Sequence, residues 1–270
     1  MTCGVKGLVA FITGAAAGLG RGTLLRFLKN GAAGVCSYDM QAFKANDEEK
    51  SAYGIGEDRL MVIQGDVRDE TKVADAFAEC HKQFGRIDAI INCAGVTTAF
   101  FTFNPSNRNV FRFADYRDVV DINVNGTFNV IRLGVGFLAK NEPSEGDKVR
   151  GHIITTSGIQ SFDGQMGQTS YASSAGAIES LVSPVAKDFS LMGIRCVNIC
   201  VGYHDTPVFS RANADFRDFF RNSSVFPRRM GQPEDYAQLV ESVITNPYIN
   251  ATSITLDGCM RPHIFPYTRF

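Results

Sequence analysis

The chain alternates short apolar runs with longer segments in which apolar residues recur every three or four positions. Short apolar runs are typical of strands buried on both faces, and the longer spacing is typical of helices that cover a sheet. The expected strands are residues 8–13, 34–38, 60–63, 88–92, 152–156, 194–200 and 253–256. The expected helices are residues 19–28, 71–84, about 115–138 and about 170–192. Strands that alternate with helices predict an α/β fold, with a parallel sheet and helices on both faces.

Three segments interrupt this alternation. Residues 97–113 form a loop rich in phenylalanine, residues 141–150 form a polar turn, and residues 204–229 mix aromatic with basic side chains. No internal repeat, low-complexity tract or linker divides the chain. We therefore expect one domain over residues 1–270, a length that a single hydrophobic core can support.

The composition disfavours several classes of protein. With 27 basic and 28 acidic residues, the chain has no net field that attracts nucleic acid or an anionic membrane. The seven cysteines lack C-x-x-C spacing and the four histidines are scattered, so we expect a reducing compartment and no metal site. No apolar run approaches the roughly 20 residues of a membrane span. The few residues before the first expected strand leave no room for a signal or transit peptide, so targeting would use the mature N-terminus unless a signal has been removed.

A glycine-rich turn lies between the first expected strand and the first expected helix. It contains Thr13, Gly14, Gly18, Leu19 and Gly20. Glycines let the backbone approach a pyrophosphate, and a helix N-terminus offers unpaired N–H groups and the positive end of its dipole. This placement favours the phosphate site of a dinucleotide, and an ordinary tight turn is the alternative.

Acidic and small residues follow the next three expected strands. Asp39 stands where a carboxylate accepts hydrogen bonds from the adenosine ribose, and its charge would repel a 2′-phosphate, so NAD is favoured over NADP. A role as a loop cap is the alternative for Asp39. The residues expected to wall the adenine and support the sheet are Asp66, Val67, Asn92, Ala94 and Gly95.

With these motifs in this order, the chain resembles the short-chain dehydrogenase/reductase family along nearly its whole length. The resembling runs are residues 5–10, 84–88, 126–133, 141–143 and 256–258. The resemblance implies a Rossmann-type doubly wound parallel sheet of about seven strands, bound NAD(H), and hydride transfer between the nicotinamide and an alcohol or ketone carbon. It further implies that Thr206 touches the nicotinamide carboxamide and that residues 203–230 form a substrate-loop-like segment.

Within the family, the chain is most similar to mitochondrial members that act on 3-hydroxyacyl-CoA or hydroxysteroids. This similarity implies a mitochondrial location and a homo-oligomer, either a dimer or a tetramer. One such member also serves as a scaffold in a tRNA-processing complex. Contact with RNA is therefore expected only through a larger protein complex.

The family's chemistry uses an Asn, a Ser, a Tyr and a Lys, and two of these four have clear counterparts. The resemblance places the Asn at Asn123 and the Tyr at Tyr171. The motif Y-x-x-x-K requires a lysine one helical turn after the tyrosine, but Ala175 stands there. Lys187 cannot replace that lysine, because it lies 12 residues further on, about 18 Å along a helix.

The serine position is altered as well. An ungapped match through residues 162–165 places Gly158 at this position, with Ser157 one residue away. A shift of one residue at a strand end turns a side chain to the other face, so Ser157 takes the role only after a local rearrangement. Val201 also stands where the family has a proline before Gly202.

These losses predict an impaired reaction. A tyrosine with an ordinary pKa of about 10 is roughly 0.1% ionised at pH 7, and a nearby ammonium is what lowers that pKa. Loss of general acid/base help typically costs about 10²- to 10⁴-fold in rate. Dinucleotide binding depends instead on the glycine turn and Asp39, so NAD is expected as the cofactor with or without turnover.

Three functions stay open at this point. The favoured one is a degenerate dehydrogenase that serves as a structural or regulatory subunit of a mitochondrial complex. The second is an active NAD-dependent oxidoreductase on 3-hydroxyacyl-CoA or a hydroxysteroid, working through Tyr171, Asn123 and Ser157. The third is a dinucleotide sensor.

Three remaining segments each have two interpretations. The phenylalanines of residues 97–113 either face a partner or a hydrophobic substrate, or pack under a long loop. The basic residues Arg217, Arg221, Arg228 and Arg229 either contact phosphates or form a solvated face, and the solvated face is favoured. The aromatic C-terminal tail, residues 259–270, either docks on a neighbouring subunit or frays.

Overall fold

The computed structural model describes residues 4–210 and 214–260. Its centre is a sheet of seven strands in the order β3-β2-β1-β4-β5-β6-β7, and every neighbouring pair is parallel. The strands are β1 (Val9–Thr13), β2 (Gly34–Asp39), β3 (Leu60–Gln64), β4 (Ala89–Asn92), β5 (Gly151–Gly158), β6 (Ile194–Val201) and β7 (Ser253–Leu256). The strand order reverses between β1 and β4, which confirms the doubly wound fold predicted from the sequence.

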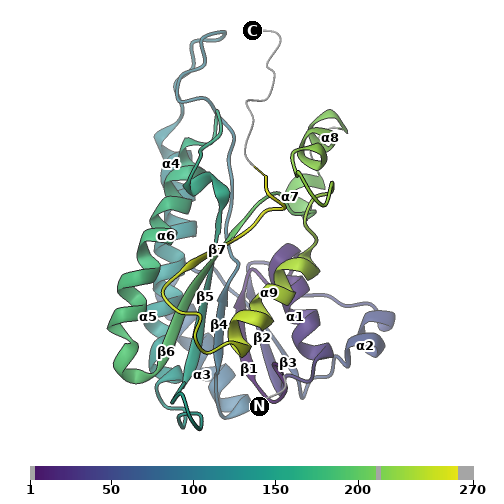
Figure 1. Ribbon diagram of the computed structural model, residues 1–270, viewed down its shortest axis with the longest axis vertical. Coiled ribbons are helices and arrows are strands. Elements are labelled where there is room, and N and C mark those ends of the chain that lie inside the picture. Colours follow the sequence, from purple (N-terminus) through teal and green to yellow (C-terminus); the bar gives the residue numbers. More distant parts are fainter. Residues whose placement is uncertain (1–3, 211–213, 261–270) are drawn as a thin grey trace.

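Helices cover both faces of this sheet (Figure 1). One face is covered by α1 (Gly18–Lys29) and α9 (Pro233–Thr245), with the short α2 (Asp47–Tyr53) beside them. The other face is covered by α3 (Glu70–Phe84), α5 (Thr127–Leu138) and α6 (Thr169–Asp188). The remaining helices in the described part of the chain are α4 (Phe113–Val120), α7 (Pro207–Ser210) and α8 (Ala214–Asn222), with short helices η1 (Asp121–Gly126), η2 (Ile159–Ser161) and η3 (Ser190–Met192).

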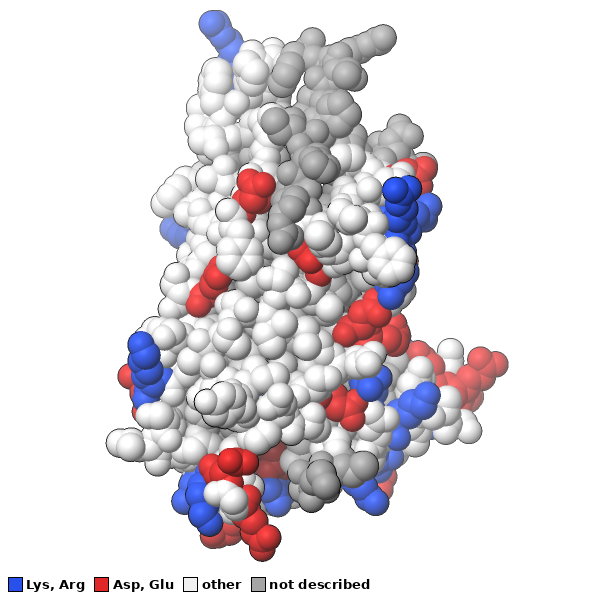
Figure 2. All heavy atoms as spheres, in the orientation of Figure 1, with Lys and Arg blue, Asp and Glu red and all other residues white. Residues whose placement is uncertain are grey.

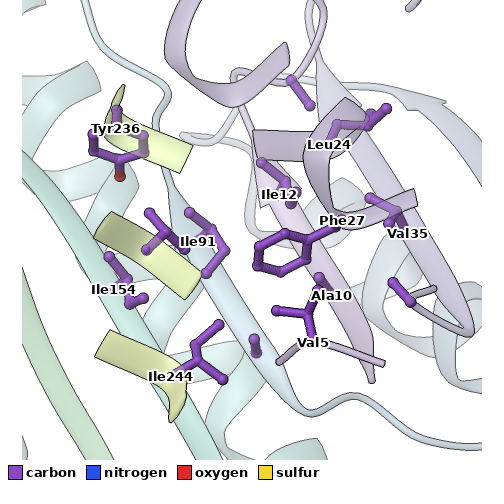
Figure 3. Close-up of a cluster of buried hydrophobic side chains, with 14 of the residues drawn as sticks. Val5, Ala10, Ile12, Leu24, Phe27, Val35, Ile91, Ile154, Tyr236 and Ile244 are labelled. Carbon is purple, nitrogen blue, oxygen red and sulfur yellow. The ribbon is translucent and has the colours of Figure 1, made fainter. Parts of the chain in front are cut away.

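The core under α1 and α9 is built from large aliphatic and aromatic side chains (Figure 3). Phe27 of α1 and Tyr236 of α9 are fully buried against Ile12 and Ile91 of the central strands. Burial of each such side chain stabilises the fold by roughly 1.5–3 kcal/mol. This packing fixes the start of α1, and with it the turn that joins β1 to α1.

The opposite core is centred on stacked rings. Phe11 of β1 stacks on Phe77 of α3 with ring centroids 4.0 Å apart. Gly134 of α5 lets this ring approach closely, because a Cβ at that position would overlap Phe77 and Ile90. The sheet therefore has a dense hydrophobic core on each face. The functional site is expected at the carboxyl ends of its strands.

Two buried polar side chains tie together the starts of the central strands. The Asp88 carboxylate accepts a hydrogen bond from the Val9 N–H at 2.8 Å and forms an ion pair with Arg86 at 2.6 Å. The Asn141 amide donates to the carbonyls of Ile87 at 2.6 Å and Arg150 at 2.9 Å. These bonds satisfy buried groups at the amino edge of β1, β4 and β5.

Arg195 of β6 closes the end of α9. Its buried guanidinium donates to the carbonyls of Val243, Ile244 and Ile249 at 3.0, 2.9 and 2.5 Å. It also donates to Nδ1 of His152 at 2.9 Å, so the His152 ring accepts at that nitrogen. Burial, together with this cation, lowers the pKa of His152 to about 3.

Several elements differ from the sequence-based expectation. The helix expected over about 115–138 is three pieces, α4, the π-helical η1 and α5. Neither α2 nor α9 was expected, although α9 has a helical pattern, with Pro233 in its first turn and buried Tyr236, Val240 and Val243. Residues 211–213 of the substrate-loop-like segment, and residues 261–270 of the expected tail, lie outside the described residues.

Surface charge is mixed on the face shown in Figure 2. Lys and Arg lie among Asp and Glu around its margins, and much of the centre is uncharged. This face presents no large patch of one sign among its coloured residues. No helix in the described chain is both long and apolar enough to cross a membrane.

Candidate functional site

A cavity of about 470 Å³ opens at the carboxyl ends of the central strands. Its wall contains most of the residues that the sequence analysis singled out for the cofactor: Gly14, Gly18, Leu19, Asp39, Asp66, Val67, Ala94, Gly95 and Thr206. It also contains Asn123, Ser157, Tyr171 and Ala175. Thr13, Gly20, Asn92 and Gly158 are not part of this wall in the described structure. The topology therefore gathers residues from most of the chain at one edge of the sheet.

The turn after β1 is shaped to admit a ligand backbone or phosphate. Gly14 has a φ of +65°, and a Cβ there would lie 2.7 Å from the Ala94 nitrogen, so only glycine fits. Helix α1 begins at Gly18 after Ala17, an N-cap residue with no side-chain capping bond. The first N–H groups of α1 are therefore available to an anion at the cavity.

Asp39 ends β2 and lies over this turn. Its carboxylate accepts hydrogen bonds from the backbone N–H groups of Ala16 at 3.1 Å and Gln41 at 2.9 Å. These bonds fix the carboxylate at the cavity wall and leave acceptor capacity on both oxygens. A rigid anion is thus in place at the site where a ribose was expected.

Thr13 and Asn92 do not line the cavity, but their side chains bind the backbone of residues beside it. The Thr13 hydroxyl accepts a hydrogen bond from the Ala94 N–H at 3.2 Å. The Asn92 amide donates to the Ile154 carbonyl at 3.3 Å. Both side chains are buried, and they hold the ends of β1, β4 and β5 together.

The expected adenine wall is held by a second set of bonds. Asp66 pairs with Arg68 at 2.6 Å, and this hydrogen-bonded partner lowers the pKa of the carboxyl. The Val67 carbonyl accepts from the Asn129 amide at 2.8 Å, and the Tyr38 hydroxyl donates to the Asp66 carbonyl at 3.0 Å. These features fit the adenosine half of a dinucleotide. The N-terminus of α1 is open, the Asp39 carboxylate is fixed by hydrogen bonds, and the residues of the adenine wall are held in place by their own bonds.

Asn123 lies in η1, and all of its polar contacts hold the protein together. Its carbonyl oxygen accepts from the Val96 N–H at 2.8 Å, and its amide donates to the Val96 carbonyl at 2.9 Å and the Ser174 hydroxyl at 3.0 Å. The Ser174 hydroxyl in turn donates to the Tyr171 carbonyl at 2.8 Å. Asn123 thus connects the loop after β4 to the first turns of α6.

Tyr171 is a neutral phenol in this site. Burial raises its pKa to about 12, and the nearby Cys200 adds to the increase. At pH 7 such a group is a hydrogen-bond donor and almost never an anion. Ala175, one turn further along α6, is buried and has no polar atom beyond its backbone.

The hydroxyl of Ser157 is hydrogen-bonded to residues of the neighbouring strand β6. The Ser157 hydroxyl accepts a hydrogen bond from the Asn198 amide at 2.8 Å and meets the Cys200 sulfur at 3.1 Å. Its side chain therefore belongs to the contact between β5 and β6. Gly158 is the residue next to Tyr171, because a Cβ there would lie 2.8 Å from the phenol oxygen.

The sequence analysis overlooked Gln160 and Tyr203. Both side chains are buried at the cavity, and the Tyr203 hydroxyl donates to Oε1 of Gln165. Burial raises the pKa of Tyr203 to about 12, and the hydrogen bonds with Gln165 and Gln160 only reduce that increase. The Gln160 carboxamide occupies the space that a Cβ on Gly158 would enter. The sequence did contain one indication of Gln160, because it places this polar residue two positions after Gly158, where the family's serine is altered.

The wall of the cavity is poor in positive charge. Among the described residues that line it, Asp39 and Asp66 supply the only carboxylates, and Lys and Arg are absent. His204 also lines the cavity, but burial lowers its pKa, so it is neutral there. The ammonium that the expected chemistry uses has no substitute in this part of the chain.

The profile of short chain dehydrogenases matches residues 8–216. The chain belongs to this family. It is 38% identical to "3-hydroxyacyl-CoA dehydrogenase type-2" of Drosophila melanogaster, over 95% of this chain and 98% of that protein. The corresponding human protein is also 38% identical, over 95% of this chain and 96% of its own length.

More distant relatives also match this chain over nearly its whole length. "Ipsdienol dehydrogenase" of Ips pini is 32% identical over 96% of this chain and 98% of that protein. The crystal structure of 3-hydroxyacyl-CoA dehydrogenase type-2 from Mycobacterium avium superimposes with a TM-score of 0.82 at 29% identity, covering 95% of this chain and 97% of that chain. Short chain dehydrogenases are oxidoreductases that generally bind NAD(P), so the cavity lies where this family places its cofactor.

Proposed function

We propose that this chain binds NAD(H), transfers hydride at least about 100-fold more slowly than its enzymatic relatives, and serves as a structural or regulatory subunit of a mitochondrial complex. The first N–H groups of α1 and the backbone at Gly14, Gly18 and Leu19 would hold the pyrophosphate. Asp39 would hold the adenosine ribose, and Thr206 the nicotinamide carboxamide. The bound dinucleotide would supply or accept the hydride.

The observation that carries this proposal is Ala175, together with a cavity wall that lacks Lys and Arg among its described residues. A tyrosine acts as a proton donor or acceptor for an alcohol only if its pKa is brought toward the working pH. No described residue on this wall lowers the pKa of Tyr171, and burial raises it to about 12. Proton transfer at Tyr171 is therefore slow, whatever hydride donor is present.

The competing function is an active oxidoreductase on 3-hydroxyacyl-CoA or a hydroxysteroid. Tyr171 and Asn123 both line the cavity, which favours this alternative, as do the names of the relatives. Turnover with NADH and acetoacetyl-CoA separates the two functions. We expect a rate about 10²- to 10⁴-fold below that of the Drosophila relative assayed in parallel. A rate within tenfold of that relative would exclude an impaired site.

Restoring the missing groups provides the sharper test. Ala175→Lys with Gly158→Ser returns the ammonium and the hydroxyl, but the serine Cβ would meet the Gln160 carboxamide. We therefore expect the largest gain when Gln160→Ala is added to this pair. Ala175→Met in the same background is the matched control, because it adds similar bulk without charge. Equal rates for the lysine and methionine triple variants would contradict the assigned cause.

The subunit role is tested by the native mass of the protein in extracts of mitochondria from its own cells. We expect a particle heavier than a tetramer of 29.5 kDa chains. Migration as a plain dimer or tetramer would count against membership in a larger complex. A protein confined to another compartment would contradict the mitochondrial assignment.

A further inference from the structure

Gln160 lies at the place where the family's serine would act. It belongs to η2, two residues after Gly158, and its side chain is buried at the cavity wall. A Cβ on Gly158 would lie 2.8 Å from the Tyr171 phenol oxygen, and closer still to Oε1 of Gln160. The carboxamide oxygen of Gln160 therefore takes up space beside the phenol that a serine side chain at position 158 would fill.

The orientation of Gln160 follows from its hydrogen bond with Tyr203. The Tyr203 hydroxyl has a single proton, and it donates that proton to Oε1 of Gln165. In its hydrogen bond with Gln160 the hydroxyl can then only accept, so Nε2 of Gln160 is the donor. This bond directs Oε1 of Gln160 away from Tyr203, in agreement with its closeness to Gly158. The site thus presents a hydrogen-bond acceptor where the family presents a serine hydroxyl.

Tyr171 is the donor that faces a ligand beside this acceptor. Its phenol keeps its proton at pH 7, because burial raises its pKa to about 12. The Asn123 amide and the Ser157 hydroxyl line the same cavity, but both are used in hydrogen bonds within the protein. A ligand next to Tyr171 therefore meets one donor, the phenol, and one acceptor, the Gln160 oxygen.

A second acceptor on the cavity wall has no donor. Gln168 is the N-cap residue of α6, three positions before Tyr171, and it lines the cavity. Its Oε1 is buried without a hydrogen-bond partner in the described part of the chain. An unpaired buried acceptor is unfavourable, and a ligand that carries an O–H group can satisfy it. This observation is independent of Gln160, and it favours the same kind of ligand.

A ketone and the corresponding alcohol differ in what they offer to Tyr171 and Gln160. A ketone oxygen only accepts hydrogen bonds, so it can accept from the phenol but would face Oε1 of Gln160 acceptor against acceptor. An alcohol accepts and donates, so one hydroxyl can bond to both side chains. A serine would not make this distinction, because its hydroxyl rotates and can either donate or accept. Discrimination is strong where a buried protein group is left unpaired by the wrong ligand.

We propose that Gln160 makes this site selective for a secondary alcohol over the matching ketone, with Tyr203 as the positioning residue that orients the carboxamide. This inference rests on the proposed function, because it takes the place beside Tyr171 as the substrate subsite. It goes beyond that function by naming the chemical form of the ligand. The hydroxy member of an alcohol–ketone pair would occupy the subunit without being converted at an appreciable rate.

Calorimetric titration of the purified full chain in the presence of ADP-ribose tests the proposal. ADP-ribose has the adenosine and pyrophosphate of the dinucleotide but no nicotinamide, so neither ligand can be converted during the measurement. The two ligands are 3-hydroxybutyryl-CoA, with each enantiomer titrated separately, and acetoacetyl-CoA, and they differ only at C3. We expect the better-bound enantiomer to bind at least about tenfold more tightly than acetoacetyl-CoA.

Two variants separate the acceptor from its orientation. Gln160→Leu removes the acceptor with little change in bulk, and the two dissociation constants should come within about threefold of each other. Tyr203→Phe keeps Gln160 but removes the bond that orients it, so the carboxamide can turn an N–H toward a ketone and the preference should fall at least threefold. A purely structural effect would weaken both ligands alike and leave their ratio unchanged. Thr97→Val, at an exposed position on the same wall, is the control that should leave the ratio unchanged.

The outcomes distinguish this inference from the proposed function. Equal or tighter binding of acetoacetyl-CoA by the natural chain, or no binding of either ligand, would overturn the inference alone. An unchanged preference in both Gln160→Leu and Tyr203→Phe would overturn the role of Gln160. Failure of ADP-ribose itself to bind would contradict the proposed NAD(H) site. Fast turnover with NADH and acetoacetyl-CoA, with the preference intact, would contradict only the impaired reaction.

Discussion

The His152–Arg195 contact predicts how acid destabilises this fold. In the folded chain the pKa of His152 is lowered to about 3, against about 6.5 for an exposed histidine. A histidine whose pKa falls on folding binds its proton more tightly when unfolded. Its contribution to stability is therefore complete above about pH 6.5 and is lost as the pH falls from 6.5 toward 3.

The size of the effect follows from this difference in pKa. At pH 5 the linkage relation gives about 2 kcal/mol for one such group. Because His152 as a whole residue is only partly buried, we expect about 1–2 kcal/mol. The main physical cause is burial, which disfavours the charged ring, and a proton on Nδ1 would also face the Arg195 guanidinium, which donates to that nitrogen at 2.9 Å.

The assay is guanidinium unfolding at pH 7.5 and pH 5, carried out on the natural chain and on His152→Gln. Glutamine can still accept a hydrogen bond from Arg195, but it does not titrate. Carboxylates with lowered pKa values, such as Asp66 and Asp235, lose stability equally in both chains and cancel in the comparison. We expect the natural chain to lose about 1–2 kcal/mol more than the variant between the two pH values. Equal losses would refute the reasoning.

Three further changes are expected to have measurable effects. Arg195→Met should lower the free energy of unfolding by about 3 kcal/mol, measured by denaturant titration, because the carbonyls of Val243 and Ile244 in α9 and of Ile249 beyond it lose their donor. Gly14→Ala should lower the melting temperature and weaken NADH binding at least tenfold by fluorescence titration, whereas Gly136→Ala, with open space around it, should leave binding unchanged. Asp39→Asn should weaken NAD⁺ binding about tenfold and narrow the difference between NAD⁺ and NADP⁺, and an unchanged NAD⁺ affinity would exclude a ribose contact.

The sheet was predictable because its strands are continuous apolar runs bounded by turn residues. All seven expected strands are present, with bounds shifted by up to two residues. Helix α9 was not predicted because residues 230–252 follow a long irregular segment. The alternation of strand and helix that indicated the other covering helices is absent there, since no strand comes directly before α9. The break at η1 depends on a widened turn whose hydrogen bonds leave no mark in the hydrophobic spacing.

Within the candidate site, positions along the chain were easier to predict than side-chain directions. Asn123, Tyr171 and Ala175 all line the cavity. The one-turn spacing on a helix suggested this for Tyr171 and Ala175, and the family resemblance suggested it for Asn123. The direction of Ser157 depends on its bond to Asn198 of the neighbouring strand, a contact between residues far apart in the sequence. Gln160 was overlooked for a similar reason, since only the fold brings its carboxamide beside Gly158.

The side-chain hydrogen bonds of Asp88 and Asn141 lie at the edge of the sheet opposite the cavity. Opening of the strand starts and movement of the loops around the cavity can therefore occur independently. At the strand starts, opening would expose buried polar groups, so backbone amides there should exchange with solvent only on global unfolding. Around the cavity, loops carry much of the wall and can part without releasing those anchors. The loops around the cavity can thus adjust to a bound ligand while the hydrogen bonds at the opposite edge of the sheet stay formed.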